Sequence, residues 1–249
     1  MSGPAARLAI IGSRGRMGRA LTHLIGGEFA SRCSLHASIH SSSAPADWLQ
    51  AFSCDLWIDF SLPAGIRGIA AAFDAARAQG TSTPPPALVI GATGHDAAER
   101  AILQGLSART LVLQASNFSI GVLVLRKALE FASPMLWDSG FRPQMIETHH
   151  VHKKDAPSGT ALTLAASTHG LGSERIQSVR AGEVVGDHEI TFHGPGEQVT
   201  LAHRALSREI FARGALEAAL WLAEKRARTP GAAGVVSLDD FFEEKLRRN

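Results

Sequence analysis

The stretch "RLAIIGSRGRMGRAL" (residues 7–21) decides the fold of the first half of the chain. Its apolar run at 7–12 predicts a buried strand, and the spacing of apolar residues at 15–27 predicts a helix that follows directly. Gly12, Gly15 and Gly18 lie at the junction. A sharp turn between a strand and a helix needs residues without a Cβ atom, so these glycines indicate a strand–turn–helix unit.

Such a turn presents free N–H groups at the helix N-terminus, where they bind a pyrophosphate. The usual dinucleotide pattern is G-x-G-x-x-G, whereas the spacing here is G-x-x-G-x-x-G, with Arg14 at the place of the middle glycine. A purely structural turn is the alternative. Because the glycines directly follow a strand and open a helix, we favour a dinucleotide site.

The alternation of strand and helix patterns continues to residue 118. Short apolar runs at 34–40, 56–61, 87–94 and 111–117 predict strands, and residues 63–79 and 96–107 predict helices. Pro63 suits a first helical turn, and Asp96 is a predicted N-cap. Apolar strands joined by helices indicate a parallel sheet that is covered on both faces. We therefore predict a Rossmann-like, doubly wound α/β domain over residues 1–118.

The pattern changes after residue 118. A helix is predicted at 120–132, then strands at 144–150, 178–185, 188–194 and 198–206, and a helix at 208–227. The alternation of apolar and polar residues, as in Val199, Leu201 and His203, predicts a sheet with one open face. We therefore predict a second, α+β domain with an open mixed sheet over residues 119–227. Residues 228–249 are expected to return to the first domain and complete it.

Composition and charge exclude several classes of function. The 249 residues carry a formal net charge of +2 and no long run of Lys or Arg, so we expect no nucleic-acid partner. No apolar window reaches the length of a membrane span, and the N-terminal apolar run is too short for a signal peptide. Cys33 and Cys54 fit neither a metal site nor a disulfide framework. These features predict a soluble cytoplasmic protein.

The stretch "ETHHVHKKDAPSGT" (147–160) concentrates histidines, lysines and acids in one short segment. It has three interpretations: a metal site, an exposed charged loop, or a proton-transfer centre. An extended backbone turns His150 and His152 to one face and His149 to the other, and the neighbouring lysines oppose a divalent cation. We therefore predict no metal at this segment.

Proton transfer fits the same segment better. In an extended chain His149 and Lys153 lie on one side, and both residue types donate protons near neutral pH. Ser158 is a predicted N-cap, so Gly159 and Thr160 begin a helix whose first N–H groups suit a carboxylate. Proton donors beside a carboxylate pocket, in a chain with a nucleotide turn, indicate hydride transfer to a small acidic molecule. An exposed charged loop is the alternative.

The choice of cofactor is expected at the end of the strand at 34–40, where an acidic residue would bind the ribose of NAD. The segment "SIHSSS" (38–43) has no carboxylate, and the next acid is Asp47. His40 and the serine hydroxyls can donate to a 2′-phosphate, and Arg16 in the turn can reach it. The sequence thus favours NADPH, with NADH as the alternative. A simply exposed His40 is also compatible with the pattern.

Several segments resemble one family of enzymes. "ETHHVHKKDAPSGTA" (147–161) is similar to the E-x-H-H-x-x-K-x-D-A-P-S-G-T-A signature of the 4-hydroxy-tetrahydrodipicolinate reductase (dihydrodipicolinate reductase) family. The segments "DFSLP" (59–63), "GATG" (91–94), "SNFSIGV" (116–122) and "VRAGEVVGDHEITF" (179–192) resemble further blocks of that family. The resemblance implies NAD(P)H-dependent reduction of 4-hydroxy-tetrahydrodipicolinate to tetrahydrodipicolinate in the diaminopimelate route to lysine.

The resemblance also implies roles for particular residues. His149 and Lys153 are the expected catalytic proton donors, and His150, Gly159 and Thr160 the expected ligands of a substrate carboxylate. Together with the turn and the cofactor strand, it gives these candidate cofactor residues: Gly12, Arg14, Gly15, Arg16, Met17, Gly18, His40, Phe60, Gly91, Thr93, Ser116, Asn117 and Phe118. His40 stands where the family has an acidic residue, which again favours NADPH.

The resemblance further implies a homotetramer formed through the sheet of the second domain, with Phe192 and Leu201 as candidate interface residues. Two other functions are compatible with the pattern. One is a different NADP-dependent dehydrogenase of an amino or sugar acid, and the other is a nucleotide sensor without catalysis. The sensor is disfavoured because His149, His150 and Lys153 are all present.

Overall fold

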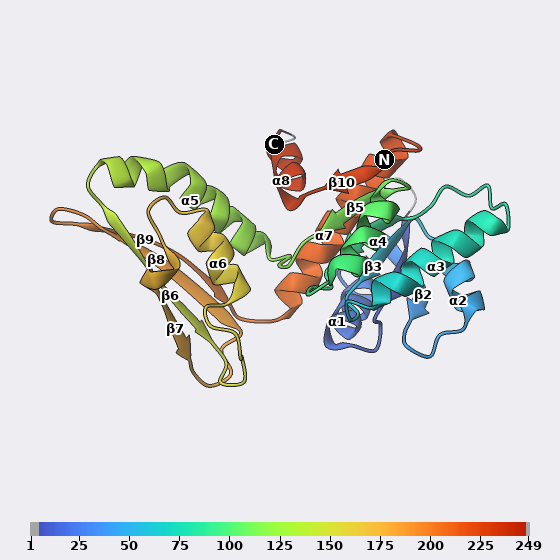
Figure 1. The fold of residues 1–249 in the computed structure, drawn as a ribbon, viewed down its shortest axis with the longest axis horizontal. Coiled ribbons are helices and arrows are strands. Elements are labelled where there is room, and N and C mark those ends of the chain that lie inside the picture. The colour runs from blue at the N-terminus through green and yellow to red at the C-terminus, as the bar shows by residue number, and fades with distance from the viewer. Residues whose placement is uncertain (1–4, 248–249) are drawn as a thin grey trace. The chain divides into compact units, whose positions relative to one another are not determined.

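The computed structural model describes residues 5–247. They form two compact units. The first unit comprises the chain up to Phe118 together with the segment from Phe211 onwards, and the second is Ser119–Ile210. Each unit is a sheet flanked by helices (Figure 1).

The first unit is built on a six-stranded sheet with the strand order β10-β5-β4-β3-β1-β2. All pairs in it are parallel. The strands are β1 (Ala6–Ile11), β2 (Cys33–Ile39), β3 (Leu56–Asp59), β4 (Ala87–Ile90), β5 (Leu111–Gln114) and β10 (Gly234–Val236). The five strands predicted for this domain are confirmed, and β10 shows that the C-terminal segment returns to it.

Helices cover both faces of this sheet. They are α1 (Arg16–Gly26), α2 (Pro45–Ala51), α3 (Gly65–Ala78), α4 (Ala97–Ser107), α7 (Glu209–Arg228) and α8 (Leu238–Arg247). Trp57 and Ile58 are successive residues of β3 and point to opposite faces, yet both are fully buried. Trp57 packs in one core with residues of α2, α3 and α4, including Ala51, Phe73 and Leu103. The doubly wound α/β fold is therefore confirmed.

Local signals set the starts of these helices. Asp96 caps α4 as predicted, because its carboxylate accepts the Glu99 N–H at 2.7 Å. Pro63 instead precedes its helix, since α3 starts at Gly65 with Ala64 as the N-cap. Helix α2 was not expected from the sequence; it starts with Pro45, and the Asp47 carboxylate accepts the Ala44 N–H at 2.8 Å.

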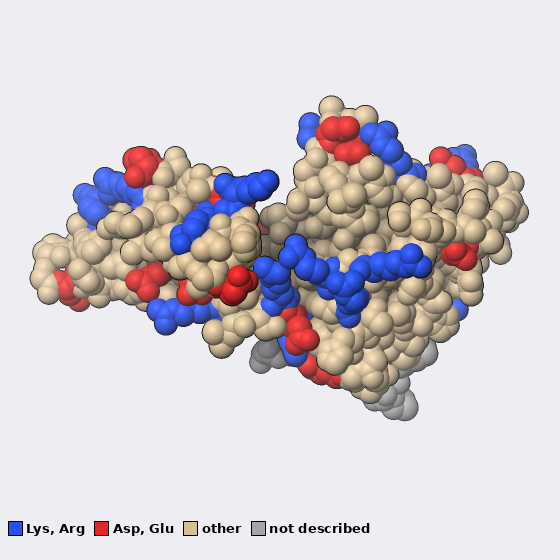
Figure 2. Space-filling view, turned by 90° about the horizontal axis from the view of Figure 1, so that it is seen from below, with Lys and Arg blue, Asp and Glu red and all other residues tan. Residues whose placement is uncertain are grey.

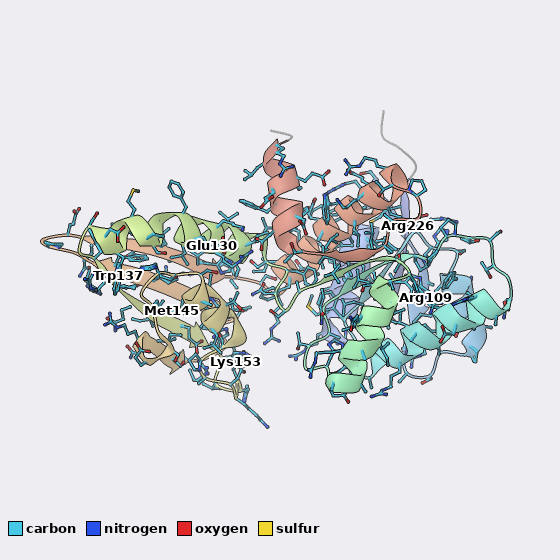
Figure 3. All side chains as sticks on the ribbon, turned by 45° about the horizontal axis from the view of Figure 1, so that its top comes forward. Arg109, Glu130, Trp137, Met145, Lys153 and Arg226 are labelled. Carbon is cyan, nitrogen blue, oxygen red and sulfur yellow. The ribbon has the colours of Figure 1, made fainter. Side chains whose placement is uncertain are left out.

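The prediction that the helix at 208–227 closes the second domain was wrong. This helix, α7, belongs to the first unit. Its Glu217 pairs with Arg32 at 2.6 Å, and its Arg226 (Figure 3) donates to the carbonyl oxygens of Pro84 and Pro85. An apolar helical stripe shows that a helix is packed but does not identify what it packs against, so the sequence left this partner open.

The second unit is a four-stranded mixed sheet with the order β7-β6-β8-β9, in which only β7 is parallel to its neighbour. The strands are β6 (Arg142–His149), β7 (Ile176–Arg180), β8 (Gly186–His193) and β9 (Gln198–Ala205), and the helices are α5 (Ile120–Asp138), α6 (Gly159–Ala166) and the short η1 (Ser173–Arg175). Residues of α5 and α6 form a core with one face of the sheet, and Met145 and Ile190 lie at its centre. The predicted α+β unit with one open sheet face is confirmed.

The two residues expected at the open face do not lie there. Phe192 is fully buried in the core under the helices, and Leu201 packs against the same core. Alternation along a strand separates two faces but does not say which one meets the helices. The other face instead carries Ile146 and Ala202 among polar side chains, including Thr148, Glu189 and Arg204.

Charged side chains of both signs are present on the visible surface of each unit (Figure 2). Among residues 5–247, no helix is long and apolar enough to cross a membrane.

Candidate active site

A cavity of about 530 Å³ lies in the first unit at the carboxyl ends of β1, β2 and β3. Ile11 ends β1 and Ile39 ends β2, while Phe60 directly follows β3, and all three line the cavity. β1 lies between β2 and β3 in the sheet, so the chain runs from β1 outward to β2 and then crosses back to β3 on the other side of β1, which reverses the strand order here. Ligands of doubly wound sheets bind at this kind of switch point.

Gly12 shapes the floor of the cavity. Its φ is +80°, and a Cβ there would lie 2.8 Å from both Phe60 O and Ser61 N. Gly15 is the N-cap of α1 and has no side chain to accept the first helical N–H groups. A ligand can therefore come close to the backbone N–H groups at the N-terminus of α1, and this arrangement fits a pyrophosphate.

Five of the predicted cofactor residues line this cavity: Gly12, Arg14, Gly15, His40 and Phe60. Two more lie against Phe60, whose ring meets Phe118 at a centroid distance of 5.7 Å and covers Gly91. The remaining six, Arg16, Met17, Gly18, Thr93, Ser116 and Asn117, are not among its lining residues. Sequence analysis missed Trp48, which reaches the cavity from the unexpected helix α2.

His40 has a defined orientation in the cavity wall. Its Nδ1 accepts the Ser42 N–H at 3.2 Å, so the neutral ring carries its proton on Nε2. The nearest acid in the sequence, Asp47, uses its carboxylate to bind the Ala44 N–H. None of the described residues that line the cavity is acidic.

A separate cluster of candidate site residues is in the other unit, at the end of β6. His149 is buried, and its Nδ1–H donates a short hydrogen bond to Oε2 of Glu147. The side chain of Glu147 is 0% exposed. Its second oxygen, Oε1, accepts from Nη2 of Arg180 at 2.9 Å. A buried carboxylate is stable only when paired in this way, so Arg180 and His149 together fix Glu147.

The pKa values in this cluster follow from burial and charge. Burial alone would raise the pKa of Glu147, but hydrogen bonds from Arg180, Ser178 and His149 outweigh it and lower the pKa. For His149, burial lowers the pKa, and the positive charges of Lys153 and Arg180 lower it further. Glu147 opposes these effects and raises the pKa of His149. Glu147 thus preserves part of the ability of His149 to hold a proton.

The loop after β6 carries Lys153 (Figure 3) and is tied to the sheet by Arg180. The Arg180 guanidinium donates to the carbonyl oxygens of Lys153 at 3.3 Å and of Asp155 at 2.5 Å. The Lys153 ammonium lies 2.9 Å from the Asp155 carboxylate and is the main reason why the pKa of Asp155 is lowered. The Gly159 N–H, at the head of α6, contributes to the same shift.

The structure therefore brings together some of the predicted residues. Ser158 caps α6 as expected, since its Oγ accepts the Ala161 N–H at 3.1 Å. Lys153 and Gly159 share Asp155 as a neighbour, and Lys153 acts electrostatically on His149. His150 faces His152 instead, with ring centroids 6.2 Å apart. Among the described residues, no group of three His, Cys, Asp or Glu side chains could hold a metal ion.

Arg180 and His188 are site residues that sequence analysis did not select. Both lie in the block "VRAGEVVGDHEITF", on strands that flank β6. The His188 ring meets the His149 ring edge-on at 5.2 Å. Burial and the charge of His149 lower the pKa of His188 to about 4. The only signal in the sequence that could have selected these two residues is that basic side chains recur on strands predicted to share the sheet.

A dinucleotide-type cavity in one unit and a buried histidine–carboxylate pair beside a helix N-terminus in the other define a class, the nucleotide-dependent oxidoreductases of small acids. Comparison with known families is more specific. The family models "Dihydrodipicolinate reductase, N-terminus" and "Dihydrodipicolinate reductase, C-terminus" match residues 6–118 and 121–242. The chain belongs to the dihydrodipicolinate reductase family, whose members are NAD(P)H-dependent oxidoreductases.

Relatives of similar length support this assignment. The chain is 41% identical over 240 residues to 4-hydroxy-tetrahydrodipicolinate reductase of Xanthomonas euvesicatoria pv. vesicatoria, covering 91% of this chain and 96% of the relative. It is 41% identical over 246 residues to the enzyme of that name from Stenotrophomonas maltophilia, covering 93% and 97%.

Solved structures share the fold. A dipicolinate-bound dihydrodipicolinate reductase from Paenisporosarcina sp. TG-14 superposes with a TM-score of 0.68 at 20% identity, covering 94% of this chain and 97% of that one. The diaminopimelate (DAP) dehydrogenase of C. glutamicum superposes with a TM-score of 0.56 at 12% identity, covering 95% and 93%. The fold is thus shared with solved enzymes of different names.

Gly186 makes room for His149, because a Cβ at Gly186 would lie 2.9 Å from His149 Nε2. We expect Gly186→Ala to displace the imidazole and lower kcat about 10- to 100-fold, as a misplacement near 1 Å does in other enzymes. Steady-state reductase kinetics measure this. Gly105→Ala is the control, because a Cβ at Gly105 meets nothing within 4 Å. A Gly186→Ala enzyme with kcat within twofold of wild type contradicts the prediction.

Glu147 raises the pKa of His149, so Glu147→Gln should lower it further. If protonated His149 is the acid in the free enzyme, kcat/KM falls as the pH rises through this pKa. In Glu147→Gln that fall should therefore move to lower pH, and each unit of movement costs about tenfold in kcat/KM at neutral pH. Profiles of kcat/KM against pH measure the shift, with the exposed Glu174→Gln as the charge control. An unmoved profile would exclude His149 as the titrating group.

Proposed function

We propose that this protein catalyses the NAD(P)H-dependent reduction of 4-hydroxy-tetrahydrodipicolinate to tetrahydrodipicolinate, in the diaminopimelate route to lysine. The observation that carries the proposal is the buried His149–Glu147 pair, set beside Lys153 and the capped N-terminus of α6. This reduction takes up a hydride and a proton and releases the 4-hydroxyl as water, so it needs a proton donor and an anion site of this kind. The family relationship supports the particular substrate.

The anion site is proposed to be the start of α6. Ser158 uses its side chain to cap the helix, and Gly159 is exposed at the first helical position. The helix dipole and backbone N–H groups favour a carboxylate there. We assign Gly159, Thr160 and His150 to the substrate carboxylates, with Lys153 supplying a positive charge close by.

The proton is proposed to come from His149 or Lys153, with solvent as a further source. The Nδ1–H of His149 is bound to Glu147, which leaves Nε2 as the atom that delivers a proton. The pKa of His149 is low because the ring is buried among positive charges. A bound dicarboxylate adds negative charge and raises that pKa, so substrate binding favours the protonated donor. When bound, NAD(P)H would supply the hydride.

Loss of the Lys153 ammonium is the direct test of this chemistry. We expect Lys153→Ala to lower kcat roughly 10²- to 10⁴-fold, the usual range for a lost acid–base group. The assay follows NADPH oxidation with substrate generated by a coupled synthase. Lys154→Ala is the matched control, because Lys154 is the exposed neighbour in the same loop.

The outcomes of this assay separate the proposals. A Lys153→Ala rate within threefold of wild type would remove Lys153 from the mechanism. A wild-type protein that turns over neither NADPH nor NADH with this substrate would overturn the proposed reaction. Activity on another amino or sugar acid would support the alternative dehydrogenase.

We propose NADPH as the preferred cofactor. The cavity wall offers the Nε2–H of His40 and the guanidinium of Arg14, both of which suit a 2′-phosphate, and Asp47 is engaged in capping α2. Further candidate cofactor residues lie outside the cavity wall. Arg16 and Gly18 belong to this proposal through the glycine turn, and Met17, Thr93, Ser116 and Asn117 through the family resemblance.

A carboxylate placed at residue 40 should reverse the preference. We expect His40→Asp to raise the KM for NADPH about tenfold through repulsion of the 2′-phosphate, and to lower the KM for NADH by binding the ribose hydroxyl. Kinetics with both nucleotides measure the ratio. His36→Asp, on the same strand but outside the cavity wall, controls for the added charge. An unchanged ratio in His40→Asp contradicts the assignment of His40.

We also propose a cytoplasmic homotetramer. The open face of the sheet in the second unit is the proposed contact surface, and it carries Ile146, which is 39% exposed, among Thr148, Glu189 and Arg204. Phe192 and Leu201 take no part in it because they pack under the helices.

A further inference from the structure

We propose that His188 is a positioning residue that holds two parts of the active site together, the capped N-terminus of α6 and the imidazole of His149. The inference rests on the proposed function, because it concerns the same dicarboxylate site. It assigns no contact with substrate to His188.

His188 occupies the centre of the sheet in the second unit. In the strand register it lies opposite Glu147 of β6 on one side and His203 of β9 on the other. It is 3% exposed, and its ring packs edge-on against His149 with an interplanar angle of 77°. A shift of this side chain therefore moves the wall against which His149 rests.

The hydrogen bonds of Ser158 define what His188 does. Ser158 Oγ accepts the Ala161 N–H at 3.1 Å and lies 3.3 Å from His188 Nε2. A hydroxyl can donate one hydrogen bond and accept two, so Ser158 can bind both the helix and the ring. In the arrangement that we propose, Ser158 donates to His188 Nε2, and the neutral ring carries its own proton on Nδ1.

The His188 ring stays neutral, with Nε2 as an acceptor, at pH values near neutrality. Burial is the main cause that lowers its pKa to about 4, and the charge of His149 adds to it. The ring thus stays neutral beside His149, Lys153 and Arg180 and adds no further positive charge. Its Nδ1 is buried and has no partner among the described residues, so the ring is held mainly through Nε2 and through packing.

The consequence for the site is a link between substrate binding and proton donation. The cap sets the direction of the first turn of α6, where Gly159 and Thr160 stand. The same ring limits the movement of His149. Loss of the acceptor at residue 188 should therefore weaken carboxylate binding and also misplace the proton donor.

The chain contains a matched control for this arrangement. Ser119 caps α5, with its Oγ accepting the Val122 N–H at 3.2 Å, and it lies 3.3 Å from Nε2 of His203. The pair of a capping serine and a strand histidine is thus repeated on the neighbouring strand, at a helix to which we assign no substrate contact. A purely structural role predicts the same result for both histidines.

The experiment compares His188→Leu, His188→Gln and His203→Leu in the full-length protein. Kinetics give kcat and KM for substrate and for NADPH, and calorimetry gives the Kd for dipicolinate, used as a dicarboxylate probe. For His188→Leu we expect KM for substrate and Kd for dipicolinate to rise about 5- to 10-fold, as for a lost buried hydrogen bond, and kcat to fall about 10-fold. KM for NADPH should stay within about twofold, because the cofactor cavity is in the other unit.

His188→Gln should restore these values to within about threefold of wild type, because the glutamine carbonyl reaches the place of Nε2 and accepts from Ser158. His203→Leu should leave kcat, KM and Kd within about twofold. If His188→Leu does not fold, His188→Asn serves as the loss variant, since its shorter amide does not reach Ser158.

Three results would overturn the inference: loss variants at residue 188 with wild-type kinetics and dipicolinate affinity, equal losses in His203→Leu, or a Gln variant no better than the loss variant. An inactive wild-type protein would instead overturn the proposed function, so the two failures are distinguishable.

Discussion

The active site depends on one buried charge, the carboxylate of Glu147. A carboxylate with no exposed surface is costly unless each oxygen is paired, and here Arg180 and His149 supply the two partners. The same two bonds position the chemistry. One orients the His149 ring, and the other holds the guanidinium that binds the carbonyl oxygens of Lys153 and Asp155. Removal of either side chain takes away one hydrogen-bond partner of the buried carboxylate, so stability and geometry are coupled in this cluster.

The cluster also sets the balance of charge that the reaction needs. His149 lies near Arg180 and Lys153, and burial together with these two positive charges holds its pKa below the ordinary value. A group with a lowered pKa holds its proton more readily when negative charge arrives close by. A dicarboxylate brings that charge, which means that binding and proton loading are thermodynamically linked. Glu147 limits how far the pKa of the imidazole falls, because the negative charge of its carboxylate opposes the effects that lower this pKa.

Local patterns predicted much of the fold and some of the residues that the structure brings together in the candidate site. Strand periodicity, the turn around Gly12 and the caps at Asp96 and Ser158 depend on neighbouring residues, so the sequence reveals them directly. The partner of α7, the inward face of Phe192 and the contact of Arg180 with Glu147 depend on residues far apart in the chain. Arg180 and Glu147 are 33 residues apart, and only the parallel pairing of β6 with β7 makes them neighbours. One sequence carries no direct record of such pairings.

The loop between β6 and α6 shows how the site selects its ligand. The carboxylate of Asp155 lies against the Lys153 ammonium, and the Gly159 N–H helps to lower its pKa. These are two of the groups that we assign to a substrate carboxylate. The Asp155 carboxylate thus shows that these groups of the loop interact favourably with a carboxylate. It also competes with any anion that binds there. A ligand with two carboxylates overcomes this competition more easily than a ligand with one, because its second carboxylate binds elsewhere and raises the effective concentration of the first.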